Sequence, residues 1–178
     1  MNEANGIHLR QFRESDVVPV RRLIHQTIDV CYSTVYPPRA VQFFRDFHSD
    51  AKILERHREG EILVVEQSGR VVGTGAIVGA DIFGVFVHPK FQRHGIGGIL
   101  MRELEARAKA RGYNEAVLSV SLPSRAFYER LGYEIIEDRS IDVGEGEILC
   151  FWKAKKALSQ EKPQHPGRGD AEDPAPHP

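Results

Sequence analysis

The 178-residue sequence contains little cysteine, and its acidic and basic residues almost cancel. Its two cysteines, Cys31 and Cys150, are far apart and form no Cys-x-x-Cys pair, so neither a disulfide framework nor a zinc knuckle is predicted. The formal net charge of -1 provides no general attraction to nucleic acid or to an anionic membrane surface. We expect neither as a partner, and any phosphate binding must depend on a local feature.

Long apolar runs and metal-binding motifs are also missing. No stretch approaches the roughly 18 apolar residues of a membrane-spanning helix. Charged residues from Glu3 onward argue against an apolar secretory segment near the N-terminus. The histidines show neither His-Glu-x-x-His nor any Cys/His ligand spacing. We therefore expect a cytoplasmic protein without a metal site.

The composition that remains suits one folded domain. Hydrophobic residues make up 41% of the chain, which is enough to build a core. From about Leu158 onward, the chain consists mainly of polar residues, proline and glycine and shows no apolar periodicity. Such a segment cannot offset the entropy lost on ordering. We predict one domain over residues 1–158 and a disordered tail over residues 159–178.

The first third of the domain shows a strand pattern followed by helical patterns. Residues 7–12 alternate apolar and polar side chains, as a half-buried strand does. Apolar residues then recur every three or four positions over residues 20–31, which predicts a helix facing a core. Shorter helical patterns follow over residues 41–47 and 50–59. Gly60 is expected to end the last of them in the left-handed conformation.

The next segment changes to the two-residue period of strands. Residues 61–66 and 70–78 are rich in strand-forming residues and are joined by a short turn, so they predict an antiparallel hairpin. Residues 81–87 predict a third consecutive strand. Gly84 lies inside it, and a glycine within a strand usually marks a bulge or a close approach of the backbone. We therefore expect a kink or a ligand at Gly84.

The second half predicts one parallel crossover. An amphipathic helix over residues 96–111 is followed by residues 116–120, a strand that is apolar on both faces. A right-handed crossover would place this strand parallel to residues 81–87. The remaining predicted elements are a short helix over 124–131 and strands over 133–138 and 147–153. The order β-α-α-β-β-β-α-β-α-β-β predicts an α/β (α+β) fold with a mixed, mostly antiparallel sheet.

Residues 85–98 run from an apolar strand through a basic turn into glycines that open a helix. The first N–H groups of a helix lack intrahelical partners, and the helix dipole adds positive charge there, so this arrangement suits phosphate. A dinucleotide fingerprint is excluded because it needs glycine where Leu100 stands. A Walker A loop is excluded because Ile99 follows Gly98. A glycine-rich turn without a ligand stays open from these residues alone.

The chain contains Gln-Arg-His-Gly-Ile-Gly over residues 92–97, preceded by Val-His-Pro over 87–89, and, within residues 123–133, a predicted short helix with Phe-Tyr followed by Leu-Gly-Tyr. These motifs resemble those of the GNAT superfamily of acyl-CoA-dependent N-acyltransferases. The first is similar to its Gln/Arg-x-x-Gly-x-Gly/Ala signature with its lead-in, and the second to its short helix with Phe-Tyr followed by Leu-Gly-aromatic. The resemblance covers roughly residues 7–153. It implies a central sheet of about seven strands, in which the parallel pair 81–87 and 116–120 splays apart to hold the cofactor.

The resemblance implies acetyl-CoA as the cofactor. Its pyrophosphate would lie on the N–H groups of the glycine turn, and its pantetheine arm would pair with the strand before that turn. Ser121 stands where the family often has asparagine, so its contact with the coenzyme would have a shorter reach. The cofactor-binding residues expected on this basis are Val85, Phe86, Val87, Gln92, Arg93, His94, Gly95, Ile96, Gly97, Gly98 and Ser121.

Acyl transfer from a thioester to an amine needs a neutral amine, a stabilised oxyanion and a proton for the departing thiolate. Tyr128 matches the family tyrosine that protonates the sulfur. The alternative role for Tyr128 is that of an aromatic residue in the core. Asp81 is the candidate base and would accept the proton directly or through water. Alternatively, Asp81 only caps the strand. Tyr32 and Tyr36 are candidate acceptor-binding residues because they lie in a proline-rich loop that can line a pocket.

The predicted function is an acetyl-CoA-dependent N-acetyltransferase that acts directly on a primary amine of a small molecule or peptide. We expect a monomer or a homodimer. Two alternatives stay open: a non-catalytic domain that binds or senses acyl-CoA, and an acetyltransferase for protein N-termini or lysines whose tail recruits partners.

Overall fold

A seven-stranded mixed sheet forms the centre of the molecule. The computed structural model describes residues 6–158, so the predicted tail over residues 159–178 lies outside the described residues. Every neighbouring pair of strands is antiparallel except β4 and β5, which confirms the mostly antiparallel sheet with one parallel pair. The strands, in their order across the sheet, are β1 (Ile7–Gln11), β2 (Glu61–Gln67), β3 (Arg70–Val78), β4 (Asp81–Val87), β5 (Glu115–Val120), β7 (Glu147–Ala157) and β6 (Glu134–Gly144).

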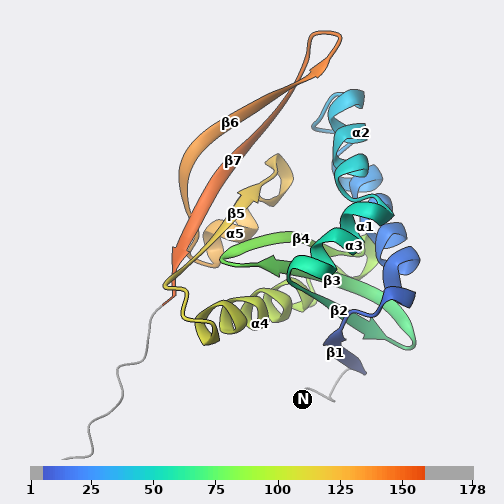
Figure 1. Ribbon diagram of the computed structural model, residues 1–178. Helices are drawn as coiled ribbons and strands as arrows, with labels where there is room; N and C mark the ends of the chain where they lie inside the picture. The colour runs from blue at the N-terminus through green and yellow to red at the C-terminus, as the bar shows by residue number, and fades with distance from the viewer. Residues whose placement is uncertain (1–5, 159–178) are drawn as a thin grey trace, which may run out of the picture.

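Helices cover both faces of this sheet (Figure 1). The first three helices lie on one side, while α4 and α5 pack on the other. The connection from β1 to β2 holds three helices, one more than the predicted element order contains. The helices are α1 (Val17–Cys31), α2 (Pro38–Phe47), α3 (Asp50–Glu59), α4 (Ile96–Ala110) and α5 (Arg125–Arg130).

Strand β2 shows how the two faces of the sheet are built. Leu63 and Val65 belong to the core that includes α4, whereas Ile62 and Val64 belong to the core that includes α1. All four side chains are buried. Successive side chains of a strand point to opposite faces, so a continuous apolar run suits a strand covered on both sides. Burying one such side chain stabilises the fold by roughly 1.5–3 kcal/mol.

Strand β4 pairs with β5 only through its first two residues, and the two strands then separate. Their parallel ladder is limited to Asp81 with Val117 and Ile82 with Leu118. Beyond this point, two residues of β4 lie opposite one residue of β3, and Gly84 has a φ of 54°. The bulge predicted at Gly84 is confirmed. It bends β4 at the place where the sheet opens.

Gly60 ends α3, but not in the predicted left-handed conformation. Its φ is -155°, which is extended backbone. A Cβ at this position would lie 2.1 Å from the carbonyl oxygen of Ile77. Glycine is therefore required here because β3 approaches closely, not because the chain turns to positive φ.

Strands β6 and β7 form a long ribbon whose tip reaches α2 (Figure 1). The backbone N–H of Arg39 donates to Oε2 of Glu147 at 2.8 Å, and the Arg39 side chain forms an ion pair with Glu145. Both strands are longer than predicted. Strand β6 continues past its predicted end through residues 139–144, which include exposed polar side chains, whereas β7 continues over residues 154–157, where it pairs with β5.

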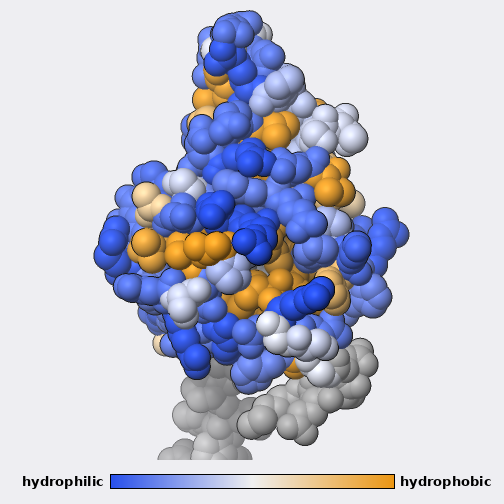
Figure 2. All heavy atoms as spheres, turned by 90° about the vertical axis from the view of Figure 1, so that its right-hand side faces the viewer, coloured by the Kyte–Doolittle hydropathy of each residue, from blue (hydrophilic) through white to orange (hydrophobic). Residues whose placement is uncertain are grey.

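The face formed by α1 and α2 exposes a mixture of apolar and polar side chains (Figure 2). Val18, Val30 and Phe47 are the large apolar side chains of these two helices that are exposed. No helix within residues 6–158 combines the length and the hydropathy needed to cross a bilayer.

Candidate active site

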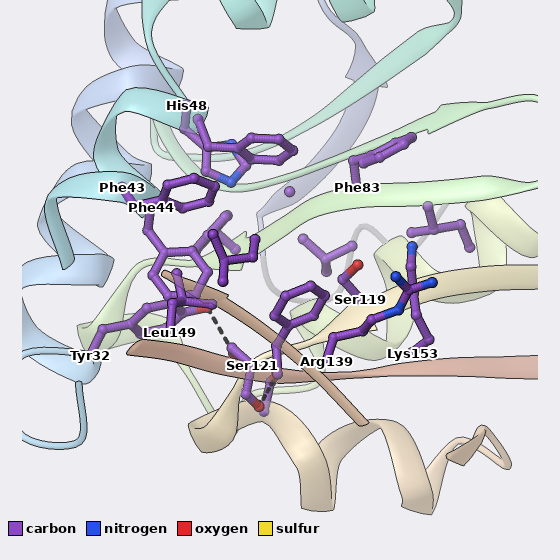
Figure 3. A pocket seen from close by; sticks show the side chains of 18 of the residues that line it. Tyr32, Phe43, Phe44, His48, Phe83, Ser119, Ser121, Arg139, Leu149 and Lys153 are labelled. Atoms are coloured by element: carbon purple, nitrogen blue, oxygen red, sulfur yellow. Dashed lines mark hydrogen bonds between the residues drawn. The ribbon is translucent and has the colours of Figure 1, made fainter. Parts of the chain in front are cut away.

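A pocket of about 390 Å³ opens where β4 and β5 separate (Figure 3). This volume is typical of sites for small molecules. Its side chains come from both halves of the sheet, from α2 and from α5, so it exists only in the folded chain. The predicted site residues that line it are Tyr32, Val85, Phe86, Ser121 and Tyr128.

One wall of the pocket is aromatic. Phe43, Phe44 and Phe47 project from α2, which places three rings along one side of the helix. The ring of Tyr32 meets Phe44 edge-on at 4.8 Å, and the ring of Phe86 lies 6.2 Å from Tyr32. Edge-to-face contacts of this kind hold aromatic side chains in fixed orientations. The wall is therefore a firm apolar surface.

Tyr128 places a phenol in this pocket. Its side chain is buried, and burial raises its pKa above the usual value, with a smaller contribution from Tyr32. No hydrogen bond to its hydroxyl is found within residues 6–158, and no fully enclosed polar side-chain atom there lacks a partner. The hydroxyl is therefore open to the pocket. It is protonated at neutral pH, which makes it a proton donor.

A short chain of hydroxyls lies beside Tyr128. Ser121 Oγ donates to the hydroxyl of Tyr32 at 2.9 Å and lies 2.7 Å from Oγ of Ser124 (Figure 3). The Ser124 hydroxyl also contacts the carbonyl oxygen of Ser121 at 3.0 Å. The Ser121 side chain is thus already engaged with protein partners. Its role in this structure is to orient Tyr32.

Tyr36 is buried but does not line the pocket. Its hydroxyl donates to the carbonyl oxygen of Cys150 at 2.9 Å and accepts a hydrogen bond from the backbone N–H of Leu122 at 2.8 Å. Burial raises its pKa to about 12. Tyr36 therefore joins the loop after α1 to β7 and to the segment after β5, and the structure does not bring it to the acceptor site.

Asp81 also lies outside the pocket. It pairs with Val117 where β4 and β5 are still hydrogen-bonded, at the closed end of the split. The structure therefore does not bring this carboxylate to Tyr128. Among the described residues, no aspartate or glutamate lines the pocket.

His48 lies in the pocket wall and is 4% exposed. Nη1 of Arg56 lies 3.1 Å from its Nδ1, and because a guanidinium only donates, Nδ1 is the acceptor. Burial and the nearby Arg56 charge hold the pKa of His48 well below its usual value, so the ring is neutral. A neutral ring that accepts at Nδ1 carries its proton on Nε2. No hydrogen bond within residues 6–158 ends on that nitrogen, and it is not fully enclosed, so its N–H is open to the pocket.

The glycine turn forms the predicted start of α4. Gly95 is the N-cap residue with a φ of 83°, and nothing lies within 4 Å of a Cβ built on it. The first hydrogen bond into the helix runs from Ile99 N–H to the Gly95 carbonyl oxygen, so the preceding N–H groups have no intrahelical partner. A Cβ on Gly97 would lie 3.0 Å from the ring of Phe127, so this glycine also permits the packing of α5.

The side chains of the basic turn divide into two groups. Gln92 Nε2 donates to the carbonyl oxygen of Val87 at 3.0 Å, so this side chain braces the turn. Arg93 and His94 are exposed, and Arg93 has a φ of 63°. Ile96 is buried in the core, so only its backbone is available at the helix start.

Comparison with known proteins identifies the fold and the family. The family model described as "Acetyltransferase (GNAT) family" matches residues 22–133, which include the split strands, the glycine turn and Tyr128. The chain belongs to the GNAT family.

Relatives of this GNAT protein are distant in sequence. A Danio rerio protein named "Probable N-acetyltransferase 14" is 34% identical over 85 residues, which cover 43% of this chain and 30% of that protein. The match thus spans less than a third of that relative's length.

Solved GNAT structures share the fold. The GCN5-related N-acetyltransferase from Rhodopseudomonas palustris has a TM-score of 0.78 at 22% identity, covering 85% of this chain and 95% of that chain. The PaiA N-acetyltransferase from Thermoplasma acidophilum, solved in complex with coenzyme A, has a TM-score of 0.68 at 18% identity, covering 85% and 98%.

The pocket of this GNAT protein also contains polar residues that the sequence patterns did not indicate. They include His48, Arg139 and Lys153. Arg139 is in phase with Ile141 on β6, and Lys153 is in phase with Phe151 on β7, so strand alternation could have assigned both cations to one face. That alternation does not predict which strands pair, and the strand pairing is what brings the two cations to the pocket.

Proposed function

We propose that this GNAT protein is an acetyl-CoA-dependent N-acetyltransferase that transfers the acetyl group directly to a primary amine of a small molecule or peptide. The observation that supports this most directly is the protonated hydroxyl of Tyr128, which opens into a pocket at the split between β4 and β5. Family membership and the free N–H groups at the start of α4 support it as well.

The residues present suit coenzyme A. The N–H groups between Gly95 and Ile99 have no intrahelical partner, and a helix start of this kind binds phosphate oxygens. Arg93 and His94 are exposed beside it and would add positive charge. Beyond Ile82, β4 has no pairing with β5, so its backbone near Val85 could pair with an amide-bearing arm. When bound, acetyl-CoA supplies the acetyl thioester.

The reaction forms a carbon–nitrogen bond and breaks a carbon–sulfur bond. Tyr128 donates its phenolic proton to the departing sulfur, because its raised pKa keeps that proton in place until charge develops nearby. The Nε2–H of His48 and the backbone N–H groups of the bulge are the donors available to the carbonyl oxygen. Because no carboxylate among the described residues lines the pocket, the proton of the amine passes to water.

Acetyl transfer to a broad panel of amines tests this proposal. Acetyl-CoA would be supplied with small amines, amino acids, and peptides and proteins that carry free N-termini or lysines, and both thiol release and acceptor mass would be followed. We expect turnover with part of the panel. Coenzyme binding without any turnover would contradict the proposal and favour a domain that only binds or senses acyl-CoA. Turnover restricted to proteins would favour a protein acetyltransferase.

A further inference from the structure

The half of the pocket away from the glycine turn is positively charged. Arg139 and Lys153 line it, and Figure 3 shows both cations at one end, beside Ser119. These two strands present Arg139 and Lys153 on the face where Ile141 and Phe151 contact the core of α1 and α2. Helix α4 packs on the opposite face. The two cations therefore belong to a different part of the site from the phosphate-binding turn.

The charges of these two cations are only partly neutralised. Arg139 forms an ion pair with Glu137 at 2.9 Å, and both side chains are about half exposed. Lys153 has no ion pair within residues 6–158, although two other lysines of β7 do: Lys155 pairs with Glu115 and Lys156 with Glu105. Glu137 lies opposite Lys153 on the neighbouring strand but is ion-paired with Arg139. A half-buried lysine that has no ion pair of its own, and faces a pocket lined by no carboxylate among the described residues, favours an anionic ligand.

A third cation lies behind the pocket wall. Arg56 is 9% exposed and forms no ion pair among the described residues. Its partners are His48 Nδ1 and the carbonyl oxygen of Phe47, which Nη2 contacts at 2.6 Å. Its guanidinium also lies over the ring of Phe47 at 4.6 Å. The positive charge of Arg56 therefore adds to the potential in the pocket, which no aspartate or glutamate among the described residues lines.

We infer that the acceptor is a primary amine that also carries a carboxylate and an apolar body, as an aromatic or aliphatic amino acid does. This inference rests on the proposed acetyltransferase function. Arg139 and Lys153 bind the carboxylate, and Ser119 offers a hydroxyl beside them. The phenylalanines of the aromatic wall contact the apolar body.

The same charges bear on the amine. A cationic environment disfavours an ammonium ion, so a bound amine loses its proton more easily than it does in water. This effect supplies the neutral nucleophile in a pocket that has no carboxylate base among the described residues. It also disfavours polyamines and lysine-rich peptides, because their further positive charges would meet Arg139 and Lys153.

Three matched acceptors test the inference: phenylalanine, phenylalaninamide and 2-phenylethylamine. They share the aromatic body and the primary amine, but only phenylalanine has a carboxylate. Steady-state kinetics would be measured with acetyl-CoA, and equilibrium binding would be measured on the protein saturated with coenzyme A. We expect phenylalanine to show a KM at least about tenfold lower than that of the other two, which corresponds to one charged contact.

Arg139→Gln and Lys153→Gln identify the residues responsible. Each is expected to raise the KM for phenylalanine about tenfold more than the KM for 2-phenylethylamine, and to leave the affinity for coenzyme A unchanged. Lys155→Gln is the matched control, because Lys155 lies two residues along the same strand and outside the pocket. It is expected to change none of these values.

The possible outcomes separate the two proposals. Equal or better binding and turnover of 2-phenylethylamine overturns the inference and leaves the acetyltransferase proposal intact. Binding of phenylalanine that depends on Arg139 and Lys153, without turnover, supports the inference and contradicts the acetyltransferase proposal. If none of the three acceptors binds or reacts while coenzyme A binds, the inference is wrong.

Discussion

Arg56 donates a hydrogen bond to Nδ1 of His48 at 3.1 Å, and this contact determines which proton the imidazole presents to the pocket. With Nδ1 accepting, the neutral ring keeps its proton on Nε2 and acts as a donor. A second proton on His48 would place two cations side by side in a buried site. His48 therefore serves this pocket as a neutral hydrogen-bond donor rather than as a base.

The neutral state of His48 predicts a pH dependence of stability. Its folded-state pKa lies well below the usual 6.5 because of burial and Arg56, so the unfolded chain takes up a proton first as the pH falls. Above pH 6.5 the ring is neutral in both states, and His48 does not lower the free energy of unfolding. Below pH 6.5 the free energy of unfolding falls by up to about 1.4 kcal/mol per pH unit, because only the unfolded chain takes up the proton. His48→Gln should flatten this slope between pH 6.5 and 5 in denaturant titrations.

The parent protein is the reference for that slope, because His88 also has a lowered pKa and contributes in the same direction. Asp16 has a pKa lowered by Arg10, so its contribution is lost only below its usual value of 3.8, outside this window. An unchanged slope in the His48→Gln variant would show that His48 is already charged in the folded protein.

Tyr128→Phe is expected to lower kcat by about a hundredfold while leaving the affinity for coenzyme A close to that of the parent, because a general acid acts in the transition state. The matched control is Tyr133→Phe. Tyr133 contacts the ring of Tyr128, but its hydroxyl donates to Glu105 at 3.1 Å and faces away from the pocket. That variant should lose about 1 kcal/mol of stability and retain kcat. Equal kcat losses in the two variants would assign Tyr128 to the core.

Gly84→Ala tests the bulge against His48. Gly84 has a φ of 54°, and a Cβ there would lie 3.1 Å from Cε1 of His48. Gly69→Ala is the control, since its φ is 73° and nothing lies within 4 Å of the new atom. Both variants should lose about 1 kcal/mol of stability from left-handed strain. Only Gly84→Ala should also lower kcat, by about tenfold or more, because it displaces His48. Matching kinetics in the two variants would contradict this.

Local patterns predicted most of the elements. The runs of strand-forming residues in β2 and β3, the stripe on α1 and the glycine that opens α4 each led to an element that the structure confirms. Gly84 even marked the bulge, because a glycine inside a strand has few other reasons to occur. The left-handed conformation predicted for Gly60 is wrong. Glycine is required there because the carbonyl oxygen of Ile77 approaches closely, and that oxygen belongs to a strand elsewhere in the sequence.

The structure brings only some of the predicted site residues to the pocket. The motif around Tyr128 identified a residue that does line the pocket, and the loop after α1 supplied Tyr32. Tyr36 occurs in the same loop, but its hydroxyl joins Cys150 and Leu122, which are distant in sequence. Asp81 was placed on the correct strand, but it lies at the end of β4 that still pairs with β5. A residue's position on a strand does not show which end of the strand opens.

By itself, the sequence determined the periodicities, the turns and the helix start whose N–H groups suit phosphate, because these depend on backbone geometry within a few residues. Only the tertiary structure decided which side chains face one another across the split. Arg139 and Lys153 reach the pocket through the pairing of β6 with β7, and His48 presents a donor because Arg56 packs behind it. Strand register and the packing of a distant helix set these contacts, and no local pattern encodes them.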